Sequence, residues 1–243
     1  MTNRTCVIVP SRGRPQNITR LLTAWHDTGA TAQLVVALDD DDPQLDTYLD
    51  VLADDMRLRE LHVIVGPRLR MNGTLNAVAA TVLDKVLEPR PGTAPRLPDV
   101  IGFMGDDHLP RTPEWDQKIE AALDNLGHGI VYADDLVQRQ NLPTAVFMSA
   151  TIVRALGYMA PPVLVHLFLD NYWRDLGLAS GRLRYLPGVV IEHLHPIAGK
   201  AEHDETYAQA NASETWTHDE EAYQAFVTDG GIIRDAAKIG ALA

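Results

Sequence analysis

Residues 100–113 read VIGFMGDDHLPRTP and join an apolar run to two adjacent carboxylates and a histidine. The apolar part, Val100–Met104, has strand character, and Asp106 and Asp107 follow at its carboxyl end. In an open α/β sheet, ligands bind just outside the carboxyl ends of the strands. Two neighbouring anions repel each other unless a cation lies between them, so the pair predicts a divalent-metal site. A solvated turn after a strand is the alternative interpretation.

Segments with strand and helix character alternate through the first half of the chain. The expected strands are Cys6–Pro10, Ala32–Leu38, Leu61–Val65 and Val100–Met104, and the expected helices are Pro15–Trp25 and Asn72–Leu87. This alternation predicts an α/β fold with a mostly parallel sheet and helices on both faces. The carboxyl ends of parallel strands share one edge of a sheet. Polar segments gather at that edge, namely residues 11–14, 39–42, 66–70 and 106–108.

The second half of the chain is less regular. The expected helices are Pro113–Leu126, Ala150–Leu156 and His166–Leu176, and the expected strands are Gly129–Tyr132, Ala145–Ser149 and Val189–Leu194. From Glu202 onward the pattern indicates helices, with turns at Gly230 and Gly231. We expect residues 1–200 to form one α/β domain and residues 201–243 to form a helical C-terminal extension packed on it.

Composition narrows the classes of function. The chain has 243 residues, a formal charge of −12 and 46% hydrophobic residues, as is typical of a globular domain. The negative charge argues against non-specific binding to nucleic acid or anionic membranes. The single cysteine, Cys6, has no partner for an internal disulfide and is expected in the core. We therefore expect a cytoplasmic protein without a membrane span, because no apolar run approaches the roughly 20 residues that a span needs.

Two polar segments follow the first two strands. Ser11–Arg14 combines a glycine that permits a tight turn with two arginines suited to phosphate. It matches neither the dinucleotide fingerprint nor the P-loop, and a solvated basic turn is the alternative. In Asp39–Asp42, a carboxylate can accept hydrogen bonds from a base or a ribose. We expect Asp42 to cap the following segment and Asp39 or Asp40 to face a ligand.

Two later features also suggest chemistry. His193 and His195 lie on the same face of an expected strand, and imidazoles are good ligands for ions such as Mn²⁺. A purely structural role is the alternative for both. Asp170 lies in an otherwise apolar helix, where desolvation would raise its pKa toward the range of a general base. A structural hydrogen bond to a neighbouring turn is the alternative for Asp170.

In this order, the motifs resemble the nucleotide-sugar glycosyltransferases of the GT-A fold, the family 2-like group. The resemblance covers roughly residues 5–200 and rests on the order of several short motifs. These are VIVPSRGRP at 7–15, VVALDD at 35–40, GTLN at 73–76, GFMGDD at 102–107 and FLDN at 168–171. The segment VIEHLHP at 190–196 is similar to small glycosyltransferases of actinobacteriophages, which would act in the host cytoplasm.

The resemblance implies transfer of a sugar from a nucleoside-diphosphate donor to an acceptor hydroxyl, with Mn²⁺ or Mg²⁺ as cofactor. It implies that Asp107 binds the metal with His193 or His195, and that Asp170 is the base if the enzyme inverts. The donor would be bound by Pro10, Ser11, Arg12, Arg14, Asp39 or Asp40, Arg68, Asn76 and, at the ribose, Asp106. Residues 196–211 are interpreted as a lid over the donor, with Lys200 placed to meet a diphosphate. The sequence does not identify the acceptor, which would be a protein or a glycan.

One departure from the family pattern keeps other functions open. Met104 or Gly105 stands where the family has the first acidic residue of Asp-x-Asp, which makes the histidine more important as a ligand or the metal dependence weaker. The missing acid favours a catalytically inactive nucleotide- or carbohydrate-binding module, whereas Asp170 and the histidine pair favour an enzyme. A sugar-phosphate nucleotidylyltransferase would carry a longer glycine-rich loop with a lysine, which Ser11–Arg14 does not provide.

Overall fold

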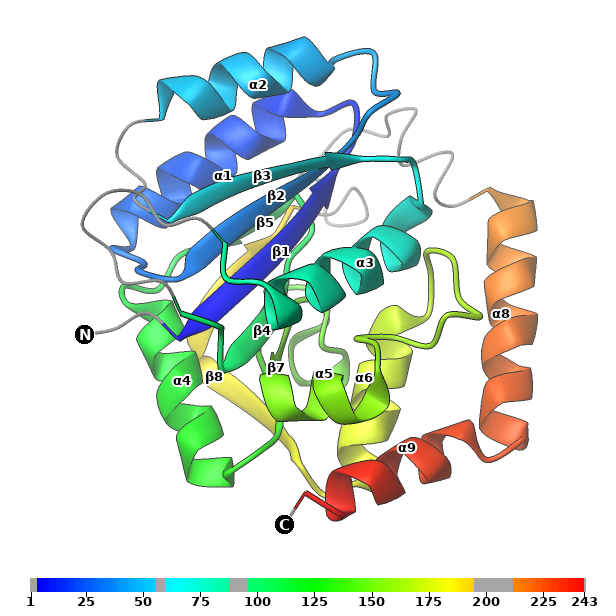
Figure 1. The fold of residues 1–243 in the computed structure, drawn as a ribbon. Coiled ribbons are helices and arrows are strands. Elements are labelled where there is room, and N and C mark those ends of the chain that lie inside the picture. Colours follow the sequence, from blue (N-terminus) through cyan, green and yellow to red (C-terminus); the bar gives the residue numbers. More distant parts are fainter. Residues whose placement is uncertain (1–3, 56–59, 88–95, 195–211, 243) are drawn as a thin grey trace.

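The computed structural model describes residues 4–55, 60–87, 96–194 and 212–242 (Figure 1). Within them, eight strands form one sheet in the order β3-β2-β1-β4-β7-β6-β8-β5. The strands are β1 (Thr5–Ser11), β2 (Gln33–Asp39), β3 (Leu61–Gly66), β4 (Val100–Phe103), β5 (His108–Pro110), β6 (Ile130–Asp134), β7 (Val146–Ser149) and β8 (Leu183–His193). The helices are α1 (Pro15–Asp27), α2 (Leu45–Asp54), α3 (Arg70–Asp84), α4 (Trp115–Leu126), η1 (Arg139–Asn141), α5 (Ala150–Leu156), α6 (Leu169–Ala179), α8 (Ser213–Thr228) and α9 (Gly231–Gly240).

The first half of the sheet is parallel, as the alternation of strands and helices predicts. β1 pairs in parallel with β2 and β4, and β2 pairs in parallel with β3. All residues of β1 and β4 are buried, because helices cover both faces of these central strands. The carboxyl ends of β1, β2, β3 and β4 therefore lie along one edge of the sheet, which is the edge where the polar segments follow.

The second half of the sheet is mixed. β7 is antiparallel to both β4 and β6, because a short connection from Asp135 to Ala145 turns the chain straight back. β8 begins at Leu183, earlier than Val189, and its pairing with β6 shifts register after Ala133. Pro187 and Gly188 interrupt the apolar pattern there, so the sequence indicates only the last part of the strand.

β5 is a short strand that the sequence did not predict, because prolines interrupt the strand pattern of its segment. It pairs antiparallel with the end of β8, with His108 opposite His193 and Pro110 opposite Ile191. Pro110 is tolerated because β5 is the edge strand of the sheet, where a missing backbone donor costs little.

Two apolar cores lie on the two faces of the sheet. One packs Ile8 and Ile101 against Leu75 of α3, with α5, α6 and α9 on the same face. The other packs Val7 against Trp25 of α1 and Trp115 of α4, with α2 beside them. Figure 1 shows α3, α5 and α6 on the near side and α1, α2 and α4 around the other side of the sheet.

The helices differ from the expectation most clearly at α2, α3 and α6. α2 is unpredicted, although its buried Tyr48 and Leu52 have helical spacing. α3 ends at Asp84, and the expected core residue Val86 is 43% exposed. α6 starts at Leu169 and not at His166, because Phe168 adopts a left-handed conformation with φ of 62°.

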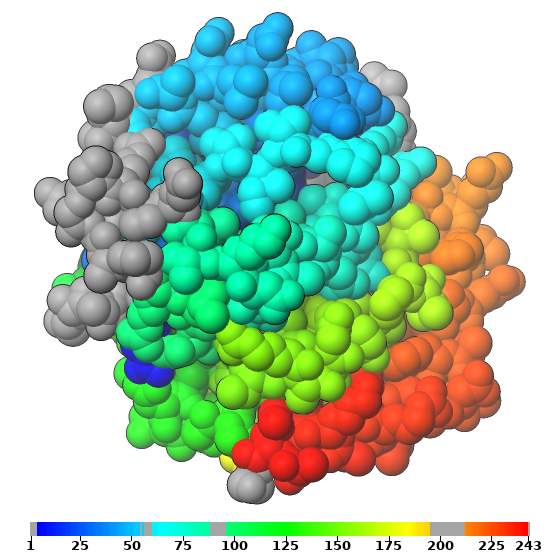
Figure 2. Space-filling model, viewed as in Figure 1, coloured from blue at the N-terminus to red at the C-terminus, as the bar shows by residue number. Residues whose placement is uncertain are grey.

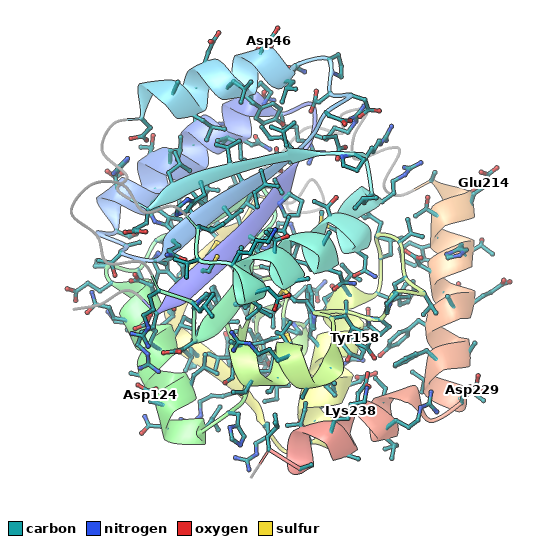
Figure 3. All side chains as sticks on the ribbon, in the orientation of Figure 1. Asp46, Asp124, Tyr158, Glu214, Asp229 and Lys238 are labelled. Carbon is teal, nitrogen blue, oxygen red and sulfur yellow. The ribbon has the colours of Figure 1, made fainter. Side chains whose placement is uncertain are left out.

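The C-terminal helix α9 packs against α5 and α6, and α8 packs against α9. Ile232 and Ile239 of α9 belong to the same core as α3. The buried carboxylate of Asp235 accepts hydrogen bonds from Tyr158 (2.6 Å) and Tyr172 (2.9 Å). Figure 3 shows Tyr158 close to Lys238, whose Nζ lies 5.9 Å from the centre of the tyrosine ring. None of the helices in the described part of the chain is long and apolar enough to span a bilayer.

Asn72 of α3 holds the loop that precedes α6. Asn72 is 1% exposed, and its Nδ2 donates to the carbonyls of Pro161 (2.7 Å) and Leu164 (2.8 Å). The backbone N–H of Asn72 also donates to the carbonyl of Val165 at 3.0 Å. These bonds fix the loop against α3 where no regular secondary structure supports it.

We predict that Asn72→Ala lowers the free energy of unfolding by about 1–3 kcal/mol, because the buried Leu164 carbonyl loses its donor. Urea denaturation followed by circular dichroism measures the change. Thr81→Ala on the same helix removes a bond to the Ala77 carbonyl and serves as the control, with a change within about 0.5 kcal/mol. Equal stability of Asn72→Ala and the control would contradict this view of the loop.

Candidate functional site

A cavity of about 310 Å³ opens at the carboxyl ends of β1, β2 and β4. Small-molecule sites commonly have this size and position. Among the residues predicted for a site, those that line it are Pro10, Ser11, Arg12, Arg14, Asp39, Arg68, Asp106, Asp107, Asp170 and His193. One edge of the sheet therefore brings together side chains that are up to 183 positions apart in the sequence.

A chain of hydrogen bonds holds the turn after β1 against Asp106. The backbone N–H of Arg14 donates to the hydroxyl of Tyr48 (2.7 Å), which bonds to Oγ of Ser11 (2.7 Å). Ser11 donates in turn to Asp106 Oδ2 at 2.6 Å, and Asn17 donates to the other oxygen at 3.2 Å. Burial and the neighbouring charge of Asp107 raise the pKa of Asp106 to about 6, against the opposing guanidinium of Arg14.

The ends of β2 and β3 add charge to the cavity. Arg12 pairs with Asp39 at 3.1 Å and also with Asp41. Burial raises the pKa of Asp39, although Arg12 opposes the shift. Arg68 lies 3.9 Å from Asp39, and Arg70 also lines the cavity, without an ion pair to any residue that the structure describes. Four arginines thus line the cavity, which suits a ligand with several negative charges.

Asp40 and Asp42 do not line the cavity. Asp40 is exposed and does not line the cavity, so only Asp39 remains as the carboxylate that faces a ligand there. Asp42 does not occupy the N-cap of α2, which is Gln44. Its Oδ1 accepts the N–H of Gln44 and its Oδ2 accepts the N–H of Gly13, both at 2.8 Å, so it ties two turns together.

Asp107 lies between two histidines. Its Oδ1 is 3.2 Å from Nδ1 of His108, and its Oδ2 is 3.4 Å from Nε2 of His193. The two imidazole rings stack with their centres 4.1 Å apart, as the β5–β8 pairing requires. Burial opposes ionisation of Asp107, but hydrogen bonds to both histidines hold its pKa well below the usual value. Burial and the charge of His193 lower the pKa of His108.

The surroundings of this cluster fit a divalent cation. One ligand atom from each of the three residues lies within 4.8 Å of the others. Nε2 of His108 is buried without a hydrogen-bond partner, and a Cβ on Gly105 would lie 2.7 Å from Asp107 Oδ1 and 3.0 Å from His108 Nδ1. Only glycine leaves the cluster open here. One carboxylate and two imidazoles form a donor set typical of Mn²⁺-like ions.

The same geometry explains the departure from the Asp-x-Asp pattern. Met104 is fully buried in the core and cannot present a carboxylate to the cavity. A side chain at residue 105 would collide with Asp107 and His108. His108, which the sequence argument left without a role, lies where it can complete the ligand set with His193.

Asp170 lines the same cavity and lies in the first turn of α6. Its Oδ1 accepts the N–H of Asn171 at 2.9 Å, and burial raises its pKa. The loop before it contributes His166, Leu167 and Phe168 to the cavity, none of which the sequence indicated. Burial lowers the pKa of His166 to about 4, assisted by Arg70 and Arg14 against the charge of Asp219, so this imidazole is neutral.

The structure does not place Asn76 in the cavity. Its amide bonds the backbone of Met159 and Ala160 and so holds the same loop as Asn72. His195, Lys200 and the segment 196–211 lie outside the described residues. Of the residues that the sequence argument missed, Arg70 and His108 lie in strand-end segments that it had singled out.

No protein-family model matches this sequence, and no curated protein is significantly similar to it. Solved structures are similar in fold. The mannosyltransferase PcManGT from Pyrobaculum calidifontis, in complex with GDP-Man and Mn²⁺, has a TM-score of 0.57 and 14% identity, covering 100% of this chain and 81% of that one. TarS from S. aureus has a TM-score of 0.52 and 14% identity, covering 80% of this chain but only 37% of TarS. The GT-A-type fold expected from the sequence is confirmed.

We predict that Asp107→Asn and His193→Ala each weaken Mn²⁺ binding by at least about tenfold, because each removes a ligand. Isothermal titration with MnCl₂ measures the affinity. Gly105→Ala keeps every ligand but crowds Asp107 and His108, and it is expected to weaken binding as well.

His26→Asn is the matched control, because His26 pairs with Asp55 at 2.9 Å in a histidine–aspartate contact away from the cavity. This variant is expected to bind Mn²⁺ like the unmodified protein. Unchanged affinity in Asp107→Asn would rule out a metal at this cluster.

Proposed function

We propose that this chain, which has the fold of the solved structures PcManGT and TarS, is a metal-dependent glycosyltransferase. It would move a sugar from a nucleoside-diphosphate donor to an acceptor hydroxyl. The observation that carries the proposal is that one cavity holds four arginines, the Asp107–His108–His193 cluster and the partly buried carboxylate of Asp170. Cations for a diphosphate, ligands for a metal and a base for a hydroxyl are the parts that this reaction needs.

The donor is expected along the ends of β1, β2 and β3. Asp39 would accept hydrogen bonds from the base, and Arg12 and Arg14 in the turn after β1 would contact the diphosphate. Arg68 and Arg70 extend the cationic wall beside Asp39. Guanidinium groups bind phosphate oxygens in a forked geometry that a lysine does not offer. This part of the proposal rests on charge and position.

Asp107, His108 and His193 would hold Mn²⁺ or Mg²⁺. Held by these residues, such a metal would supply positive charge to offset the negative charge on the leaving diphosphate. The arginines of the cavity stabilise the same charge. His166 is neutral and adds no charge of its own beside Arg14 and Arg70.

Asp170 is proposed as the base that accepts a proton from the acceptor hydroxyl. It lines the same cavity as the metal cluster, and burial raises its pKa toward the range where a carboxylate is a useful base. Its contact with the N–H of Asn171 fixes one oxygen and orients the carboxylate in the first turn of α6.

An inactive binding module is less well supported by the structure. That reading depended on the missing first acid of the Asp-x-Asp pattern, and the packing around Gly105 accounts for the absence. A pure binding protein also has little use for a carboxylate with a raised pKa in the same cavity as the Asp107–His108–His193 cluster.

A thermal-shift screen tests the donor site. It uses nucleotide sugars with UDP, GDP, dTDP or CMP as the nucleotide, each with Mn²⁺ and with EDTA. A nucleotide at about 100 times its dissociation constant adds about 2.7 kcal/mol to stability, which shifts the midpoint measurably. We expect one nucleotide to stabilise the protein only when Mn²⁺ is present. Failure of every nucleotide to stabilise the protein would contradict the proposed donor site.

We predict that Asp170→Asn lowers the rate of sugar transfer by about 10²–10⁴-fold, because the acceptor hydroxyl loses its base. Nucleotide affinity measured by the thermal shift is expected to stay unchanged. Asp175→Asn is the control, since Asp175 lies on the same helix, bonds to Arg174 and Tyr223, and does not line the cavity. Equal transfer rates in the two variants would exclude Asp170 as the base.

A further inference from the structure

We infer that Asp219, on the C-terminal helix α8, is a positioning residue for the loop that carries Asp170. This inference rests on the function proposed above. Through Asp219, α8 would support the geometry of the site, although no residue of this helix lines the cavity. In Figure 2 the orange C-terminal helix lies against the yellow-green part of the chain that leads into α6.

The carboxylate of Asp219 is fully buried and binds consecutive backbone groups of the loop. Its Oδ1 accepts the N–H of Val165 (2.9 Å), and its Oδ2 accepts those of His166 (2.8 Å) and Leu167 (2.7 Å). Nδ1 of His218 lies 2.9 Å from Oδ1, so each carboxylate oxygen of Asp219 has two hydrogen-bond partners. Hydrogen bonds to a charged acceptor are about twice as strong as neutral ones, so these contacts define the backbone path of the loop.

The loop needs such support because its local sequence does not favour its shape. Phe168 has a φ of 62°, a left-handed conformation that bulky residues rarely adopt and that surrounding structure must enforce. Its ring packs against two aromatic side chains of α8. The ring centres are 5.6 Å apart for Trp216 and 5.7 Å apart for Tyr223. α8 thus holds both the backbone before Phe168 and the ring of Phe168 itself.

The position of Asp170 follows from this arrangement. α6 begins directly after Phe168, and Asp170 is the second residue of the helix. A change in the path of residues 165–167 would therefore turn the first residues of α6 and move the carboxylate of Asp170 relative to Asp107 and His193. A displacement of about 1 Å at a reacting group can cost about a hundredfold in rate.

Asp219→Asn tests the inference with little change in volume. The amide nitrogen of asparagine cannot accept, so at least one loop N–H faces a donor in place of an oxygen. Asp235→Asn is the matched control, because Asp235 is an equally buried carboxylate of the C-terminal helices that bonds Tyr158 and Tyr172 away from the cavity. Both variants are expected to lose stability, so loss of stability alone does not distinguish them.

The first measurement is turnover of the nucleotide sugar that gives the largest thermal shift with Mn²⁺, at a temperature where both variants are folded. We expect Asp219→Asn to lower kcat at least tenfold with little change in KM for the donor, and Asp235→Asn to keep kcat. Equal kcat in the two variants, or a change confined to KM in Asp219→Asn, would overturn the inference.

The second measurement is hydrogen–deuterium exchange of the amides of residues 165–170, which needs no substrate. Faster exchange in Asp219→Asn but not in Asp235→Asn is expected, and equal exchange would overturn the inference. If the unmodified protein turns over no nucleotide sugar, the proposed function fails. The exchange result still decides whether Asp219 holds the loop.

Discussion

The contact of the Asp107 carboxylate with two imidazoles is the interaction on which the site depends. It requires β4 to deliver Asp107 to the edge of the sheet and β5 to turn back against β8, so that His108 lies opposite His193. Gly105 keeps the space beside the carboxylate open, and the buried Met104 anchors the end of the strand in the core. A metal placed here would share the cavity with the arginines at the ends of β1 and β3 and with Asp170, the proposed base at the start of α6.

The walls of the cavity are held by carboxylates that never enter it. Asp42 ties the turn after β1 to the turn before α2 by accepting the N–H groups of Gly13 and Gln44. Asp135 accepts backbone N–H groups of Val137, Gln138 and Arg139 and the hydroxyl of Thr144, and its own carbonyl accepts the N–H of His193. Asp219 does the same for the loop before α6. Irregular backbone needs such partners because no sheet or helix satisfies its polar groups.

The sequence was a good guide where chemistry and periodicity are local. The parallel strands and the polar edge they share could be predicted, because strand ends and acidic pairs are visible in short segments. The GT-A-type architecture was expected from the resemblance of the motif order to that family. His108 was missed because its partner, His193, is 85 positions away and meets it only through the unpredicted β5–β8 ladder. Asn76 was expected in the donor pocket because its motif, GTLN at 73–76, resembles a motif of the glycosyltransferase family. In the structure, its side-chain amide forms hydrogen bonds with the backbone of Met159 and Ala160. The loop from Val165 to Phe168 depends on a carboxylate more than 50 residues later, which no local pattern reveals.

The most direct test of the account is a crystal structure with Mn²⁺ and the selected nucleotide, with anomalous scattering used to locate the metal. The account predicts an anomalous peak bound by Asp107, His108 and His193, with the diphosphate beside Arg12 and Arg14 and the base at Asp39. A peak at another set of ligands, or a nucleotide bound outside this cavity, would contradict it.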